Sequence, residues 1–373
     1  MKILVIVGTR PEAIKMAPLI LAMQKEAAIT LKVCITAQQR QMLDQVLDFF
    51  QIVPEYDLNI MLPNQTLNSL SGRLFQSIDE VYIDYKPDLV FVHGDTTTST
   101  ICAMAAYHRS IEVVHIEAGL RTYNKKAPFP EEVNRQITGR IADIHYAPTP
   151  GAKQNLLKEG VNDRDIFVTG NTVIDALRLG LQIIEQGYSD SEIAMLERII
   201  NTKLKLIVVT GHRRENFGEG FIQICTALKE IALFEGVQVI YPVHLNPNVT
   251  IPVHQLLGDL NNVLLIEPLS YPAFLYLMGK SYLIITDSGG VQEEAPSLGK
   301  PVLVMREVTE RPEAVEAGTV KLVGTDKVKI VNAVSQLLND PLAYEKMTQK
   351  HNPYGDGYAS EKIIDSLLKK SKK

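Results

Sequence analysis

The chain opens with KILVIVGTRP at residues 2–11, where a short apolar run is followed at once by a polar turn. The apolar and β-branched residues of Ile3–Val7 are typical of a strand that is buried on both faces of a parallel sheet. Pro11 can occupy the first turn of a helix that begins after Thr9-Arg10. Because five apolar residues are fewer than a signal peptide needs, the stretch predicts the strand, loop and helix of an α/β unit.

Similar apolar runs recur along the chain, and most gaps between them are long enough for a helix. The first series continues with residues 31–35, 88–92, 113–116 and 145–147, and a second series comprises residues 166–168, 204–209, 237–241, 263–266, 282–286, 302–305 and 321–323. A helical pattern at Phe221–Phe234 lies within the second series. This rhythm predicts an α/β protein with two Rossmann-like, doubly wound domains, whose parallel sheets face a central cleft.

The length of 373 residues also fits two domains of about 150–200 residues each. Gly170-Asn171 is a turn signal between the two halves, so we expect an N-terminal domain at residues 1–169 and a second domain at residues 170–356. The amphipathic C-terminal helix at residues 357–373 is expected to dock and complete the N-terminal domain.

Composition excludes several classes of function. Hydrophobic residues make up 46%, charged residues 22%, and the net charge is −5, so we expect a globular protein that does not bind nucleic acid. No apolar run approaches the roughly 20 residues of a membrane span, which predicts no membrane insertion. Cys34, Cys102 and Cys225 are far apart, as expected of reduced thiols in a cytoplasmic protein.

Three nucleotide-binding or hydrolase motifs are missing, namely GxGxxG after the first strand, GxxxxGK[ST], and GxSxG. No histidine pair has HExxH spacing either, so we expect no NAD and no metal cofactor.

Ligands of open α/β sheets bind beyond the carboxyl ends of the strands, and the residues at those positions are unusually polar here. They are Gly8–Arg10, His93–Thr98 and Glu117–Arg121 in the first half, and Gly211–Asn216, His244 and Asp287–Gly290 in the second.

Ser288-Gly289-Gly290 follows a predicted strand and should open a helix, whose free N–H groups can bind a phosphate. Glu294, one turn further, can accept from a ribose hydroxyl pair. An ordinary strand-to-helix turn explains the same residues. Four cations, at Arg10, Lys15, Arg213 and Arg311, can balance a diphosphate, although each also suits a surface ion pair, and Lys15 sits where a helix would expose it.

Asp95, Glu117 and Glu131 are candidates for acid/base catalysis because they converge from separate segments on one rim. Asp95 can instead be a helix N-cap, and Glu131 a helix-start acid. His212 follows a strand and precedes two arginines, so it can donate a proton to a leaving phosphate. His93 and His115 fit buried, hydrogen-bonded core positions better, and His244 suits either role.

Taken together, these segments resemble the non-hydrolysing UDP-N-acetylglucosamine 2-epimerases, which share the two-domain architecture of the glycosyltransferase B (GT-B) class. The resemblance rests on residues 8–15, 92–98, 117–122, 129–135, 169–175, 211–216, 241–247, 287–298, 309–313 and 352–357.

The resemblance implies an isomerase that interconverts UDP-N-acetylglucosamine (UDP-GlcNAc) and UDP-N-acetylmannosamine (UDP-ManNAc) for polysaccharide biosynthesis. UDP leaves C1, a carboxylate takes the C2 proton to give 2-acetamidoglucal, and UDP adds back. Asp95, Glu117 and Glu131 are the implied catalytic carboxylates, with His212 assisting the departure of UDP. Binding of UDP is implied for Arg10, Lys15, Ser288, Gly289, Gly290, Glu294 and Arg311. Family members are typically homodimers.

One departure concerns the allosteric UDP-GlcNAc site of bacterial members. The family often has Thr-Gly-Gln-His-Arg where this chain reads Thr36-Ala37-Gln38-Gln39-Arg40, and Arg-Gln where it reads Asn64-Gln65. Substrate activation is therefore expected to be weaker or differently built. Its candidate residues are Gln38, Gln39, Gln41, Gln65, Arg213 and His244.

Three alternatives stay open at this point. A hydrolysing epimerase would let water trap the intermediate and release N-acetylmannosamine with UDP. A GT-B glycosyltransferase would use the cleft for a sugar donor. A nucleotide-sugar sensor would bind without turnover, but it would not need three carboxylates and His212.

Overall fold

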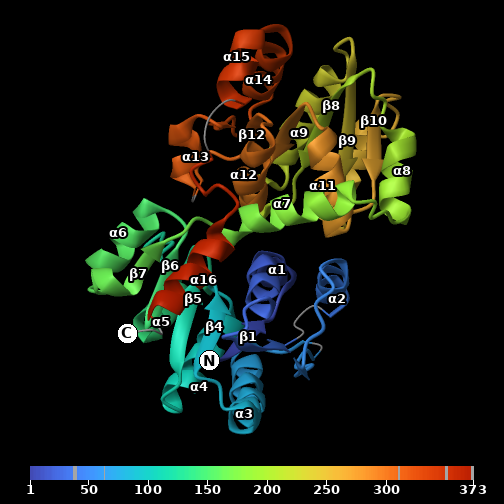
Figure 1. The fold of residues 1–373 in the computed structure, drawn as a ribbon. Helices are drawn as coiled ribbons and strands as arrows, with labels where there is room; N and C mark the ends of the chain where they lie inside the picture. Colours follow the sequence, from blue (N-terminus) through green and yellow to red (C-terminus); the bar gives the residue numbers. More distant parts are fainter. Residues whose placement is uncertain (37–39, 63, 310, 349–351, 371–373) are drawn as a thin grey trace. The chain divides into compact units, whose positions relative to one another are not determined.

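A computed structural model describes residues 1–36, 40–62, 64–309, 311–348 and 352–370. The chain divides into two compact units. Unit 1 comprises Met1–Leu179 with the C-terminal segment from Tyr354, and unit 2 comprises Gly180–Pro353. Each unit is an α/β layer structure built on its own parallel sheet (Figure 1).

The sheet of unit 1 has seven strands in the order β3-β2-β1-β4-β5-β6-β7, and every neighbouring pair is parallel. The strands are β1 (Lys2–Val7), β2 (Thr30–Ile35), β3 (Tyr56–Asp57), β4 (Leu89–His93), β5 (Glu112–Ile116), β6 (Ile144–Ala147) and β7 (Ile166–Val168). Strand β1 lies in the middle, where all its residues after Lys2 are buried, as the opening apolar run predicts. The strand order reverses between β1 and β4, which is where doubly wound sheets bind ligands.

The helices of unit 1 cover this sheet. They are α1 (Arg10–Gln24), α2 (Arg40–Phe49), α3 (Leu67–Tyr85), α4 (Thr97–His108), α5 (Glu131–Ile141), α6 (Pro150–Lys158), α16 (Ala359–Lys370) and the first part of α7 (Thr172–Glu185), with a 3-10 turn at Asp163–Asp165. Helix α1 begins as predicted, with Thr9 as N-cap and Pro11 in the first turn. In the described part of the chain, no helix is long and apolar enough to cross a membrane.

Strand β7 corrects the predicted assignment of residues 166–168 to the second series. It pairs with β6, with His145 opposite Ile166, and therefore belongs to the first sheet. Unit 1 also continues past residue 169, because Asp175 in α7 accepts the backbone N–H groups of Ala359 and Ser360 at 3.1 and 2.6 Å. These bonds hold the start of α16, which packs against α1.

The sheet of unit 2 has six parallel strands in the order β10-β9-β8-β11-β12-β13. They are β8 (Lys205–Thr210), β9 (Val237–Pro242), β10 (Val263–Ile266), β11 (Leu283–Thr286), β12 (Val302–Val304) and β13 (Val320–Leu322). The order again reverses at one point, between β8 and β11. The prediction of two doubly wound parallel sheets is thus confirmed.

Unit 2 contains the remainder of α7 and further helices that belong to it entirely. These are α8 (Ser191–Ile199), α9 (Glu219–Ile231), α10 (Pro247–Leu257), α11 (Tyr271–Lys280), α12 (Gly289–Glu294), α13 (Pro312–Ala317), α14 (Lys327–Asn339) and α15 (Pro341–Thr348), with 3-10 turns at Arg214–Asn216 and Ala295–Leu298. Helix α9 is the predicted helix at residues 221–234. The three cysteines, one of them in α9, are free and buried, as expected of core residues.

Candidate active site

Glu117 follows β5 in unit 1 and is the most tightly held of the three candidate carboxylates. Its side chain is 8% exposed and forms an ion pair with Lys15. Its Oε2 also accepts a hydrogen bond from Asn171 Nδ2 at 2.7 Å and lies 3.9 Å from His93 Nε2. The backbone of Glu117 has φ 62°, a left-handed conformation that is costly for a residue with a Cβ. Strained backbone of this kind clusters at functional sites.

The electrostatics of this group favour an ionised carboxylate. Burial raises the pKa of Glu117, but the charge of Lys15 and the hydrogen bonds outweigh burial, so the pKa lies well below the ordinary value. Burial lowers the pKa of His93 to about 4, which keeps its imidazole neutral near pH 7. An anionic carboxylate beside a neutral imidazole can accept a proton from a bound substrate.

The side chain of Lys15 is less exposed than the sequence predicts. Its position on α1 suggested an exposed side chain, but that side chain is only 13% exposed and its ammonium group contacts Glu117. The expectation fails because β1 and β4 are neighbours and β5 follows β4, so the first turns of α1 lie near the end of β5. In unit 1, Lys15 thus forms an ion pair with a candidate catalytic carboxylate.

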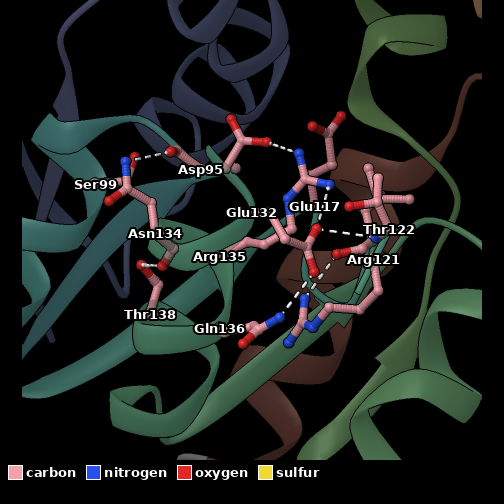
Figure 2. A network of polar contacts seen from close by, with 12 residues as sticks. Asp95, Ser99, Glu117, Arg121, Thr122, Glu132, Asn134, Arg135, Gln136 and Thr138 are labelled. Atoms are coloured by element: carbon pink, nitrogen blue, oxygen red, sulfur yellow. Dashed lines mark hydrogen bonds and ion pairs between the residues drawn. The ribbon is translucent and has the colours of Figure 1, made fainter. Parts of the chain in front are cut away.

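Asp95 follows the neighbouring strand β4, and its surroundings are shown in Figure 2. Its carboxylate forms an ion pair with Arg135 of α5, and its backbone oxygen accepts from Asn134 Nδ2 at 2.9 Å. The alternative role of Asp95 as an N-cap is wrong, because Thr96 caps α4 by accepting the N–H of Ser99 at 3.0 Å. The side chain of Asp95, 26% exposed, is therefore available for another role.

The loops of Asp95 and Glu117 lie against each other. A Cβ placed on Gly94 would be 3.6 Å from Glu117 Oε1. Glu131 is the first residue of α5, as the helix-start interpretation predicts, but its Oε2 is buried without a hydrogen-bond partner among the described residues. Two of the three carboxylates thus share one part of unit 1, and the third begins the helix that carries Arg135.

His212 follows β8 in unit 2 and is oriented by a buried aspartate. Its Nδ1 lies 3.4 Å from Oδ1 of Asp287, whose side chain is fully buried. The other carboxylate oxygen of Asp287 accepts the backbone N–H groups of His212 and Arg213 at 2.8 and 2.9 Å. His244 stacks on His212 with ring centroids 5.5 Å apart. The Nε2 of His212 is the nitrogen that this arrangement leaves for a ligand.

The pKa of His212 is lower than usual because burial disfavours the charged ring, although the charge of Asp287 opposes this shift. Such a histidine is mostly neutral near pH 7. With Nδ1–H directed at Asp287, Nε2 of the neutral ring is an acceptor, and it becomes a donor when the ring takes up a proton.

The predicted phosphate site is assembled at the start of α12. Ser288 is the N-cap and its side chain forms no capping hydrogen bond. Arg311 lies against this turn, since a Cβ on Gly289 would be only 2.6 Å from its Nη1. Its Nε donates to Glu293 at 2.6 Å. Glu294 lies beside Gly290 and is largely buried. The residues expected to bind UDP in this half therefore lie together.

The candidate allosteric residues are only partly described. Gln38 and Gln39 lie outside the described residues, and for Gln41 only the backbone is described. Gln65 accepts a hydrogen bond from Arg73 in unit 1. Arg213 and His244 lie beside His212 in unit 2.

Four residues hold the candidate groups although the sequence predicts no site role for them, namely Glu12, Arg135, Asn171 and Asp287. Two of them carried a local signal, because Thr9 and Glu12 have the spacing of a capping box and Asp287 directly follows a predicted strand. The carboxylate of Glu12 accepts from Thr9, Thr96 and Ser99, and so joins the starts of α1 and α4. The other three contact partners that are at least 40 residues away in the chain.

Comparison with known proteins agrees with this architecture. A family model described as UDP-N-acetylglucosamine 2-epimerase matches residues 21–368. A UDP-N-acetylglucosamine 2-epimerase from Campylobacter jejuni is 56% identical over 374 residues, covering 99% of this chain and 97% of the relative. One from Salmonella typhimurium is 54% identical over 369 residues, covering 98% of each chain.

Solved structures agree as well. The crystal structure of UDP-GlcNAc 2-epimerase from Neisseria meningitidis bound to UDP-GlcNAc has a TM-score of 0.92 at 52% identity, covering 99% of this chain and 100% of the other. The Methanocaldococcus jannaschii enzyme in complex with UDP-GlcNAc and UDP has a TM-score of 0.81 at 34% identity, covering 99% of both chains. With its two parallel α/β units, the chain belongs to the UDP-N-acetylglucosamine 2-epimerase family.

Proposed function

We propose that this chain interconverts UDP-GlcNAc and UDP-ManNAc without hydrolysis. The observation that carries the proposal is the buried carboxylate of Glu117, which Lys15 holds in its ionised form at the end of β5. The names of the relatives and the ligands of the solved structures support the choice of substrate.

The chemistry explains why a carboxylate group and a phosphate site are both needed. The C2 proton of UDP-GlcNAc has no adjacent carbonyl, so direct abstraction is too slow. Departure of UDP from C1 develops positive charge on the ring and acidifies C2–H, as in the oxocarbenium-like reactions of glycosidases. A carboxylate then removes the C2 proton and leaves 2-acetamidoglucal. Protonation on the other face and return of UDP give UDP-ManNAc.

The roles of the side chains follow from these steps. We assign proton transfer at C2 to the group formed by Asp95, Glu117 and Glu131 in unit 1. We assign the diphosphate to the turn at Ser288–Gly290 with Arg311, and the ribose to Glu294, since α12 begins at this turn. Departure of UDP is assisted by His212 in its protonated form, in which Nδ1–H faces Asp287 and Nε2–H can donate to a phosphate oxygen.

Arg10, at the start of α1, is a further proposed contact of the diphosphate. Lys15 is paired with Glu117, so we expect its ammonium group to contact the substrate only beside that carboxylate.

Neither NAD nor a metal takes part in any of these steps, so we propose that the enzyme needs neither. Turnover should persist after treatment with EDTA and removal of small molecules. We also propose that the enzyme is cytoplasmic and that it forms a homodimer. Light scattering of the purified protein tests the homodimer.

Incubation with UDP-GlcNAc in deuterated water, followed by proton NMR, tests the reaction. Deuterium at C2 of intact UDP-ManNAc is the expected result, because solvent supplies the returning proton. Release of free N-acetylmannosamine and UDP would instead establish a hydrolysing epimerase. No exchange at C2 in the absence of a sugar acceptor would contradict epimerisation altogether.

A further inference from the structure

We infer that Arg135 is a positioning residue for Asp95, in an assembly that Glu132 anchors; this inference rests on the proposed role of Asp95 in proton transfer. Figure 2 shows the arrangement, in which the guanidinium group of Arg135 reaches from α5 to the carboxylate of Asp95 in the loop after β4. The two residues are 40 positions apart in the chain.

The guanidinium group of Arg135 bridges two carboxylates. Its Nη2 contacts Oδ2 of Asp95, and its Nη1 lies 3.5 Å from Oε2 of Glu132. The side chain of Arg135 is 11% exposed and that of Glu132 is fully buried. A planar guanidinium group held at both sides directs its N–H groups along fixed lines, and therefore fixes the carboxylate that it contacts.

Glu132 is anchored independently of Arg135. Its two carboxylate oxygens accept the backbone N–H groups of Thr122 and Tyr123 at 2.9 and 3.0 Å, and Oε1 also accepts from Gln136 at 2.8 Å. Burial raises the pKa of Glu132, but these hydrogen bonds outweigh it and the pKa lies below the ordinary value. An ionised Glu132 therefore holds Arg135 in place and joins α5 to the loop that follows Glu117.

The backbone around Asp95 does not depend on Arg135. Asn134 Nδ2 holds the Asp95 carbonyl oxygen at 2.9 Å, and Glu12 accepts from Thr96 Oγ1 and Ser99 Oγ at 2.8 and 2.9 Å. Loss of the guanidinium group should consequently free the side chain of Asp95 and leave its loop in place. This separates a positioning role from a general structural one.

The geometry also assigns the two oxygens of Asp95. Arg135 occupies Oδ2, so Oδ1 is the oxygen that can face a substrate. Rotation of the carboxylate away from this orientation would misplace the reacting oxygen by about 1 Å or more, which is enough to lower a catalytic rate about a hundredfold.

The test compares Arg135→Ala, Arg135→Lys and the control Arg140→Ala, which removes an exposed arginine from the same helix. We expect Arg135→Ala to lower kcat for UDP-GlcNAc about a hundredfold while the Kd for UDP changes less than threefold. Guanidinium chloride at tens of millimolar should raise the kcat of Arg135→Ala at least tenfold, whereas sodium chloride at the same concentration should not. Arg135→Lys should fall between wild type and Arg135→Ala, and Arg140→Ala should match wild type.

A second measurement keeps the inference testable if Arg135→Ala folds poorly. The residual C2 deuterium exchange of Asp95→Asn is measured over long incubations, and adding Arg135→Lys should lower it no further, because the amide at position 95 can no longer transfer a proton. Full activity of Arg135→Ala, a loss without guanidinium rescue, or an additive loss in the Asp95→Asn background would each overturn the inference. Absence of turnover by the wild type would instead refute the proposed function.

Discussion

The pair formed by His212 and Asp287 resembles the histidine and aspartate of hydrolase triads in its division of roles. The buried carboxylate faces Nδ1 and holds the loop through two backbone N–H groups, which leaves Nε2 for the ligand. In such pairs the aspartate fixes the tautomer and the orientation of the ring. The same division of roles explains why Asp287 is fully buried and His212 is not.

Asp287→Asn should therefore lower kcat about tenfold or more, because the amide no longer fixes the tautomer of His212. The pKa of His212, followed by NMR, should fall further, since the charge of Asp287 raises it in the wild type. Asp259→Asn, which changes an exposed carboxylate of the same unit, serves as the control. An unchanged kcat with a shifted pKa would show that His212 is not a proton donor in the reaction.

The Lys15–Glu117 pair should couple strongly in a double-mutant cycle. Glu117→Gln and Lys15→Met each leave one buried group without its counter-charge, which costs about 3 kcal/mol of unfolding free energy. The double variant should be much closer to wild type, because a neutral pair carries no buried charge. Urea unfolding measures these differences.

For comparison, Asp79→Asn breaks an exposed ion pair with Arg109 and should change stability little. Additive effects of Glu117→Gln and Lys15→Met would show that the two groups do not interact in solution. All variants of Glu117 are expected to be inactive, whatever their stability.

Helix α16 is the C-terminal segment of the chain, and it completes the layer of helices that packs on the sheet of unit 1. The carboxylate of Asp175, itself buried, accepts the first two N–H groups of α16, and Tyr146 on β6 contacts Ser366 near its end at 2.7 Å. The N–H groups at a helix start have no partner within the helix, so an acceptor from another helix can replace a local cap.

Asp175→Ala should destabilise this docking by about 1–2 kcal/mol, the usual cost of losing a helix cap. Hydrogen exchange followed by mass spectrometry should show faster exchange over α16 than in the wild type. Asp365→Ala removes an exposed carboxylate from α16 itself and should leave exchange unchanged. Equal protection of α16 in both variants would mean that apolar packing against α1 suffices to hold the helix.

Three buried histidines on adjacent strands of unit 1 should make the stability of the protein depend on pH. Burial lowers the pKa of His93 to about 4, of His115 to about 3 and of His145 to about 4, from the ordinary value of 6.5. Between about pH 6.5 and pH 4, the unfolded chain therefore binds more protons than the folded one. Stability should fall on acidification by about 1.4 kcal/mol per pH unit for each histidine.

Urea unfolding at a series of pH values from 7.5 to 5 measures this slope, and His115→Asn should reduce it. His108→Asn, which changes an exposed histidine of unit 1, should leave the slope as in the wild type. A slope that is unchanged by His115→Asn would show that folding does not lower the pKa of this imidazole.

Much of the fold can be predicted from local sequence patterns. Apolar β-branched runs alternate with helical patterns, and a parallel sheet covered on both faces is the structure that buries them, so the class and most strands were predictable. The candidate groups were predictable for a related reason. Parallel strands bring their carboxyl ends to one edge, so the residues after β4, β5, β8 and β11 had to lie at the edges where ligands bind.

Other features depended on contacts between distant parts of the chain. The three residues of β7 carry no sign of the sheet they join, because register with β6 is set by hydrogen bonds across the sheet. The pairing of Lys15 with Glu117 and of Arg135 with Asp95 depends on which strands become neighbours. Local pattern encodes which face of its own element a residue occupies, whereas strand order decides what packs on that face, and here strand order paired each of these two carboxylates with a cation.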